Sequence, residues 1–357
     1  MGSLMDKRSR GGRNLPVVLV TAVGAPPGLN ALRALKEKRH YKLIAADADP
    51  MSPGLYLYGD GTVLPKAANE KEYIAALTAL ISARQISVII PCVEEEILVL
   101  AKYRKQFEKL GVRMLIPEYP VVNAATNKEK LLDFAMRNGI ACPRTRGIPA
   151  KMGIRERKRE LADFTDASSP PWIVKPCMGH GMHDVFQVDS LGEAWDCIKS
   201  AKRDFVVQEF IPGKVGSMYL VGLLYNFKGE LVRRFVSRSI RTLYPTGGPA
   251  TAGISLDLPV LAEVTERLIG LVGEWCGPVN VEWMLDPRDE EFKLIEINPR
   301  MWGYGYLAVG SGTNFPDLIV KLACGKDVGK DPGYRTGVVM LRATHDVIVQ
   351  DASSIGS

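Results

Sequence analysis

Polar side chains that could bind a cation alternate along one apolar segment of the chain. In LIEINPRMWGYG, residues 294–305, Glu296 and Asn298 are two positions apart and Arg300 follows them. Alternate residues of a strand point to the same face, so Glu296 and Asn298 should share one. Carboxylate and amide oxygens are ligands that Mg²⁺ prefers in proteins. The spacing therefore predicts a cation site with a guanidinium group beside it.

A second carboxylate comes from the preceding apolar segment, VNVEWML. The proline-containing turn DPRDEE separates the two segments and predicts an antiparallel hairpin. If Leu285 faces Phe292, Glu282 lies opposite Glu296 or one step from it. Like charges across a ladder destabilise a sheet, so this pair needs solvent or a cation between its members. A solvated acidic face is the alternative; the cation interpretation predicts Mg²⁺ held by Glu282, Glu296 and Asn298.

Groups suited to phosphate precede the hairpin. Lys175 ends the apolar segment WIVK, and a loop with Gly179 and Gly181 follows it. Backbone N–H groups of such a loop suit phosphate oxygens, with the lysine as a point charge. The loop is not a Walker sequence, because no GK[ST] closes it. His180 and His183 in the loop are interpreted as surface residues, since no third metal ligand accompanies them.

Two kinds of element would position these groups. Over residues 16–117, short apolar runs, the last at 112–117, alternate with amphipathic segments, which is typical of a parallel sheet covered on both faces. After residue 171, strands, turns and single helices indicate antiparallel sheets. The polar, basic segment 148–171 is predicted to be a helix and loop outside the core. The fold class is α/β followed by α+β: a doubly wound domain, then a two-part fold with antiparallel sheets.

The composition is that of a globular protein. The chain has 357 residues, of which 46% are hydrophobic and 24% charged, a net charge of +6 and six scattered cysteines. The mild positive charge suits small anionic substrates better than nucleic acid or a membrane, and neither of these partners is predicted. No apolar run approaches the roughly 20 residues that span a bilayer, and the first 14 residues lack the apolar part of a signal peptide. These features predict a cytoplasmic location.

Taken in order, these segments resemble the ATP-grasp superfamily, in particular the branch of the carbamoyl phosphate synthetase large subunit and carboxylate-amine ligases. The resemblance runs from about residue 16 to about residue 325 and is carried by NKEKL, IVKP, GHG, QEFIPG, VEW and EINPR. A strand ending in ExNPR, preceded by a glutamate on its neighbour, is the most specific match. The chain departs from the family pattern at Met182 and Asp184 in the glycine loop. It also has Gly216 where the family places an acid for the ribose.

The resemblance implies ATP and Mg²⁺ as cofactors, with Mn²⁺ as a substitute, and it assigns roles by position. The residues assigned to ATP are Lys128, Lys175, Gly179, Gly181, Glu209, Phe210 and Ile211, the last three through their backbone. The residues assigned to the metal are Glu282, Glu296 and Asn298. Arg300 is assigned to catalysis, on the transferring phosphoryl group.

Five segments follow from the resemblance, three of them folded parts. They are a disordered tail (1–14), a pre-ATP-grasp α/β domain (15–120), a lid or central subdomain with its linker (121–213), a C-terminal ATP-grasp subdomain (214–330) and a C-terminal extension (331–357). ATP is expected between the lid and the C-terminal subdomain.

The implied activity is that of an ATP- and Mg²⁺-dependent carboxylate-amine ligase, which forms an amide or peptide bond through an acyl phosphate and releases ADP and phosphate. The substrates would be a small carboxylate and an amine or amino acid, and a homodimer is compatible with the sequence. Arg238 and Arg241 precede a glycine turn and are predicted to bind a substrate carboxylate, or alternatively to pair with local acids. Two alternatives stay open: a carbamoyl or carboxyl phosphate synthetase, and a nucleotide-binding protein that has lost catalysis.

Overall fold

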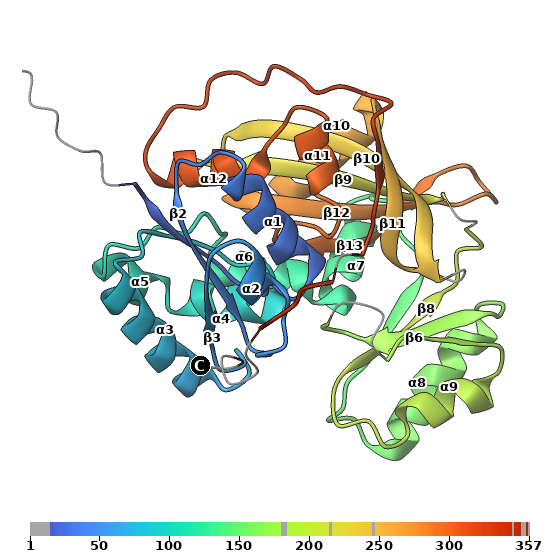
Figure 1. Ribbon diagram of the computed structural model, residues 1–357. Coiled ribbons are helices and arrows are strands. Elements are labelled where there is room, and N and C mark those ends of the chain that lie inside the picture. Colours follow the sequence, from blue (N-terminus) through green and yellow to red (C-terminus); the bar gives the residue numbers. More distant parts are fainter. Residues whose placement is uncertain are drawn as a thin grey trace, which may run out of the picture.

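Three sheets with helices around them form the described part of the protein (Figure 1). The structure is a computed structural model that describes residues 15–179, 184–213, 216–244, 247–344, 346–350 and 355. The predicted tail, residues 1–14, lies outside these ranges, as do Gly181, Met182 and both loop histidines. No helix among the described residues is long and apolar enough to cross a membrane.

The first sheet is parallel, as predicted, with the strand order β3-β2-β1-β4. Its residues alternate between two cores: Val18 and Val20 pack with α1 on one face, and Leu19 packs with α3 on the other. Helices therefore cover both faces. Its strands are β1 (Val17–Val20), β2 (Lys42–Asp47), β3 (Asp60–Val63) and β4 (Val88–Ile90). The helices of this region are α1 (Pro26–Lys36), α2 (Gly54–Leu57), α3 (Glu70–Arg84), α4 (Glu94–Lys102), α5 (Arg104–Lys109) and α6 (Tyr119–Thr126).

The strand predicted at residues 112–117 does not form. Only Arg113 pairs with β4, as an isolated bridge to Val88. The apolar side chains after it, including Leu115 and Ile116, are buried because this segment packs between the first sheet and the rest of the molecule. Residues 112–117 are therefore apolar because they form a buried connecting segment, not because they form a strand.

The second sheet is antiparallel, with the order β5-β8-β6-β7, and forms a separate lobe in Figure 1. Its elements are β5 (Thr145–Ile148), α8 (Ile154–Asp166), β6 (Trp172–Pro176), β7 (Phe186–Val188), α9 (Leu191–Ile198) and β8 (Phe205–Glu209), entered through α7 (Lys128–Arg137). The prediction that segment 148–171 lies outside the core is wrong. Helix α8 buries Leu161 and Phe164 against this sheet, since their spacing of three places both on one helical face.

The third sheet is antiparallel and has the order β13-β12-β9-β10-β11-β14. Its strands are β9 (Met218–Tyr225), β10 (Leu231–Tyr244), β11 (Gly247–Leu256), β12 (Gly277–Leu285), β13 (Phe292–Asn298) and β14 (Val339–Leu341). Helix α10 (Pro259–Val272) packs on one face. The other face shares a core with β1, α1, α11 (Tyr306–Gly310) and α12 (Phe315–Ala323), so it is joined to the first sheet.

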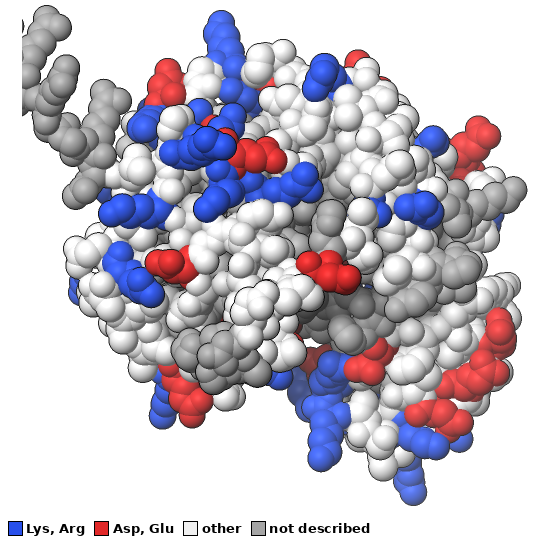
Figure 2. Space-filling model, in the orientation of Figure 1, with Lys and Arg blue, Asp and Glu red and all other residues white. Residues whose placement is uncertain are grey.

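Charged side chains on the outer surface are mixed in sign. On the face drawn in Figure 2, lysine and arginine side chains gather in the area that α1 and α12 occupy in Figure 1. The residues that line one hollow there include Arg33, Lys36, Arg39 and Lys42 together with the acids Glu37 and Asp60. The excess of positive charge is thus interspersed with acids on this surface.

Candidate active site

Strands β12 and β13 form the predicted hairpin, with Leu285 opposite Phe292. The same ladder places Glu282 directly opposite Glu296, after a shift of register next to Glu282. An unshifted ladder would instead pair Glu282 with Ile295 and turn the Glu296 side chain to the other face of the sheet. The irregularity in the ladder is therefore what brings the two carboxylates together on one face of the third sheet.

Two amide side chains join the carboxylates. Asn298 Nδ2 donates to Glu296 Oε1 at 3.1 Å and lies 3.3 Å from Glu282 Oε1. Asn280, which sequence reasoning missed, places its Nδ2 3.3 Å from the same Glu282 oxygen. Alternation along β12 could have identified Asn280, because it lies two residues before Glu282. The predicted convergence of two carboxylates and an amide is present in the structure.

The two glutamates differ in their affinity for a proton. Burial and the facing Glu296 raise the pKa of Glu282 well above the usual carboxyl range. Burial acts on Glu296 in the same direction, but Lys128 and Lys175 outweigh it and lower the pKa of Glu296. A proton therefore stays on Glu282 more readily than on Glu296. A bound cation would replace that proton and reduce the repulsion between the two carboxylates.

Two buried lysines approach this carboxylate pair from other elements. Lys128, at the start of α7, has its Nζ 3.4 Å from Glu296 Oε2 and donates to the Gly179 carbonyl at 2.8 Å. Lys175, on β6, donates to Gln208 Oε1 at 2.9 Å. Burial and the neighbouring Lys128 lower the pKa of Lys175 to about 8. Both lysines are only 7% exposed, unlike the exposed Lys36 of α1, so their charges are held within the site.

Arg300 links this cluster to the first sheet. Its Nη2 donates to Asn298 Oδ1 at 2.8 Å and to Glu94 Oε1 at 3.0 Å, and its Nη1 donates to the Met301 carbonyl at 3.1 Å. Glu94 begins α4 just beyond β4, and sequence reasoning missed it. The carboxyl end of a strand in a parallel sheet is where ligand-binding residues gather, and that rule could have found it.

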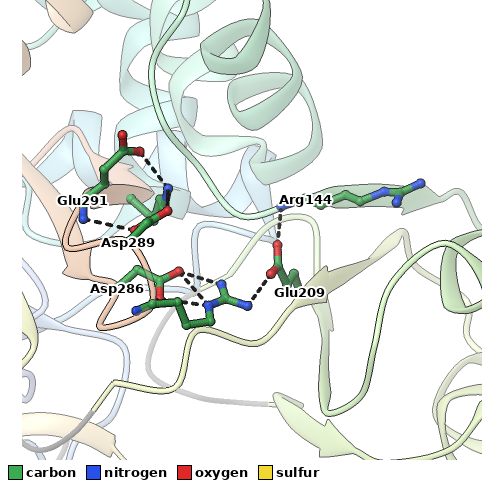
Figure 3. A network of polar contacts seen from close by, with 7 residues as sticks. Arg144, Glu209, Asp286, Asp289 and Glu291 are labelled. Carbon is green, nitrogen blue, oxygen red and sulfur yellow. Dashed lines mark hydrogen bonds and ion pairs between the residues drawn. The ribbon is translucent and has the colours of Figure 1, made fainter.

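The segment predicted to hold adenine is tied to the hairpin turn. Glu209, the last residue of β8, accepts a hydrogen bond from Arg288 Nη1 at 2.6 Å, and its other oxygen is 3.4 Å from the Arg144 backbone nitrogen (Figure 3). Arg288 also binds Asp286 through two nitrogens. The Glu209 side chain is thus engaged by the hairpin, and its backbone N–H donates to the Arg144 carbonyl at 2.9 Å. The predicted adenine contact is therefore left to the Glu209 carbonyl and to the backbone of Phe210 and Ile211.

The structure does not bring Arg238 and Arg241 to the cluster. Arg238 pairs with Tyr219 in the ladder, and Tyr219 belongs to the face that packs against α10. The neighbouring Leu220 pairs with Glu282, so the carboxylates lie on the opposite face. Arg241 is exposed and donates to the Thr251 hydroxyl at 2.9 Å. The substrate role predicted for the two arginines has no support from their placement.

A group of buried hydroxyls lies on the carboxylate face instead. The hydroxyls of Ser237 and Tyr304 interact with each other, and the Ser239 hydroxyl has no hydrogen-bond partner among the described residues. Trp302 packs against Gly222, where a Cβ would come within 2.3 Å of the indole ring. Buried hydroxyls that find no partner in the protein are costly, and bound water or ligand commonly satisfies such groups. Ser237 and Ser239 carry no motif, so sequence reasoning did not single them out.

Family comparisons agree with this fold. Residues 125–304 match the ATP-grasp domain family, and residues 18–115 match the PylC-like, N-terminal domain family. The chain belongs to the ATP-grasp family, and the family predicted from the sequence is confirmed.

Curated relatives are larger than this chain. The carbamoyl phosphate synthase large chain of Rubrobacter xylanophilus is 22% identical over 320 residues, which cover 85% of this chain and 28% of that protein. The arginine-specific large chain of carbamoyl phosphate synthase from the chloroplast of Oryza sativa subsp. japonica is 25% identical over 237 residues, covering 62% and 19%. This chain therefore corresponds to one part of such a protein.

Solved structures share the fold along most of the chain. Biotin carboxylase from Campylobacter jejuni has a TM-score of 0.68 and 18% identity, covering 91% of this chain and 74% of that one. An N5-carboxyaminoimidazole ribonucleotide synthetase in an ADP complex has a TM-score of 0.69 and 16% identity, covering 92% and 82%. An L-amino acid ligase from Bacillus licheniformis has a TM-score of 0.64 and 18% identity, covering 87% and 74%. At these identities the likeness establishes the fold.

Proposed function

We propose that this protein is an ATP- and Mg²⁺-dependent ligase that joins a carboxylate to an amine through an acyl phosphate. One observation carries the proposal: Lys128, Lys175 and Arg300 converge on the facing pair Glu282 and Glu296 from three separate parts of the chain. Membership of the ATP-grasp family supports ATP as the phosphoryl donor. The structural relatives named above include a ligase that acts on amino acids, which supports substrates of that class.

The donor set fits Mg²⁺. Glu282 and Glu296 face each other across the ladder, which is unfavourable for two carboxylates unless a proton or a cation lies between them. Two carboxylates are hard oxygen ligands, and Mg²⁺ completes its shell with water and substrate phosphates. The Asn298 amide would join them by turning its oxygen, which accepts from Arg300 in this structure, toward the glutamates. Mn²⁺ accepts the same ligands. When bound, the ion would neutralise charge on the phosphates and orient them.

The chain's own residues would do the remaining work by position and charge. Lys128 and Lys175 supply positive charges where the phosphates of ATP are expected. Arg300, fixed by Glu94 and Asn298, would stabilise the negative charge of the transferring phosphoryl group. Phosphoryl transfer needs little covalent chemistry from a protein, because positioning and neutralisation of charge dominate.

The two bond changes follow in order. A carboxylate oxygen of the first substrate attacks the γ-phosphorus, the bond to ADP breaks, and an acyl phosphate forms. The nitrogen of the amine then attacks the acyl carbon and loses a proton, and phosphate leaves with the oxygen that came from the carboxylate. The products are an amide, ADP and phosphate.

The test is to incubate the purified protein with MgATP and with panels of carboxylates and amines, and to measure ADP, AMP and phosphate. We expect ADP and phosphate release that requires one carboxylate and one amine together. Formation of AMP would contradict the acyl phosphate. Turnover restricted to bicarbonate with ammonia would indicate carbamoyl phosphate chemistry, and tight ATP binding without turnover would indicate a nucleotide-binding protein.

A further inference from the structure

Lys175 is held in place by a neighbouring glutamine. Its Nζ donates to Gln208 Oε1 at 2.9 Å, and both side chains are buried, at 7% and 4% exposure. Lys175 lies on β6 opposite Val206 of β8, and Gln208 is two residues further along β8, so Lys175 and Gln208 are diagonal neighbours on the same face of the second sheet. A lysine side chain has four rotatable bonds and a strongly hydrated ammonium group, so a buried acceptor decides where that group rests.

A second contact fixes which end of the Gln208 amide faces the lysine. Gln208 Nε2 donates to Thr145 Oγ1 at 2.8 Å, and Thr145 Oγ1 donates in turn to the Pro143 carbonyl at 2.9 Å. Because the hydroxyl proton is used on Pro143, its oxygen can accept from the amide nitrogen. The carbonyl oxygen of Gln208 is therefore the end that points to Lys175, and the contacts form one directed chain.

Gln208 also stands directly before the segment where adenine is expected. Glu209 follows it, and Glu209 is anchored to Arg288 of the hairpin turn at 2.6 Å. The same short stretch of β8 thus carries the contact to the phosphate lysine and the start of the predicted adenine segment. A shift of β8 would move both groups together.

We propose that Gln208 is a positioning residue that aims the Lys175 ammonium group at the phosphates of the nucleotide and couples it to the adenine-binding end of β8. This inference rests on the nucleotide site of the proposed function and assigns Gln208 a role in addition to the residues named there. Thr145 acts one step further away, by orienting the Gln208 amide.

Gln208→Leu keeps the size of the side chain and removes the acceptor. The probes are ATP, ADP and adenosine, each with Mg²⁺, and their dissociation constants are measured by calorimetry. We expect about tenfold weaker binding of ATP and ADP, which is the effect of losing one hydrogen bond to a charged group. Adenosine binding should not change, because adenosine has no phosphate for Lys175 to contact.

A double-mutant cycle with Lys175→Met separates positioning from a general structural role. If Gln208 acts through Lys175, adding Gln208→Leu to Lys175→Met should cause no further loss of ATP affinity. Thr145→Val should also weaken ATP binding, but by less than Gln208→Leu does. If Gln208→Leu does not fold, Thr145→Val takes its place in the double-mutant cycle. The matched control is Gln106→Leu, an exposed glutamine on α5, outside the second sheet, for which we expect no change.

Equal losses for ATP and adenosine, or losses that add in the double mutant, would overturn the inference. Failure of the unsubstituted protein to bind MgATP would overturn the inference and the proposed function together. If MgATP binds but no carboxylate and amine are joined, only the proposed function fails, since the binding cycle still tests Gln208.

Discussion

Glu296→Gln should lower the rate of carboxylate-dependent ADP release by about a thousandfold, the upper range for losing one preorganised group that stabilises developing charge. The substitution keeps the size and the strand position of the side chain but removes the charge that Lys128 approaches at 3.4 Å. A neutral amide would bind Mg²⁺ much more weakly between the two facing side chains. The measurement is steady-state turnover with saturating MgATP, together with the magnesium concentration needed for half-maximal rate.

The matched control for this substitution is Glu291→Gln. Glu291 lies on the same hairpin but is exposed and pairs with Lys293 at 2.9 Å, as Figure 3 shows for the turn. Exposed ion pairs contribute little to stability, so this variant should turn over at the normal rate. Near-normal turnover by Glu296→Gln, with an unchanged magnesium requirement, would remove the metal site assigned here.

Arg300→Met should lower kcat by roughly a hundredfold or more while changing the dissociation constant of MgATP only slightly. An interaction that strengthens as charge moves onto the transferring phosphoryl group contributes to the transition state more than to binding. Single-turnover kinetics, with the carboxylate and amine that the panel experiment selects, would separate the chemical step from nucleotide binding.

The difficulty with this variant is structural, because Glu94 would lose its guanidinium partner. A buried charge that loses its partner destabilises the fold, by about 3–5 kcal/mol in measured cases. Adding Glu94→Gln should therefore recover thermal stability without recovering turnover. Recovery of both would show that Arg300 only supports the structure. Arg137→Met, which removes an exposed pair with Asp133, should affect neither property.

The order of strands and helices was largely readable from the sequence, because hydrophobic periodicity differs between parallel and antiparallel sheets. The two wrong predictions have a common cause. Hydrophobic periodicity shows that a segment is buried, but it does not show which other segment packs against it. Residues 112–117 are apolar because they pack between two parts of the molecule, and they make only one bridge. Helix α8 was assigned to the outside because its charges hid the two buried positions, Leu161 and Phe164.

Within the site, pairing and alternation could place only the residues that lie on one hairpin. Pairing and alternation set Glu282, Glu296 and Asn298 on one face, and the structure agrees. Contacts between distant segments were not accessible in this way. The bond from Arg300 to Glu94 spans 206 positions, and spacing within a segment gives no information about it.

Arg238 shows the opposite error. It was grouped with the site because its residue type suits a carboxylate and because it precedes a glycine turn. A strand places neighbouring residues on opposite faces, and the ladder puts Arg238 with Tyr219 rather than with Leu220. The face of a residue could not be fixed before the pairing of β9 with β10 and β12 was known.

The most direct test of the acyl phosphate is the fate of a carboxylate oxygen. The carboxylate substrate is labelled with ¹⁸O in both carboxyl oxygens, and the reaction is run with unlabelled MgATP, amine and water. We predict that each released phosphate carries one ¹⁸O atom, because the oxygen that attacks the γ-phosphorus leaves with it. Phosphate without ¹⁸O, formed at the same rate as the amide, would contradict the mechanism proposed for this site.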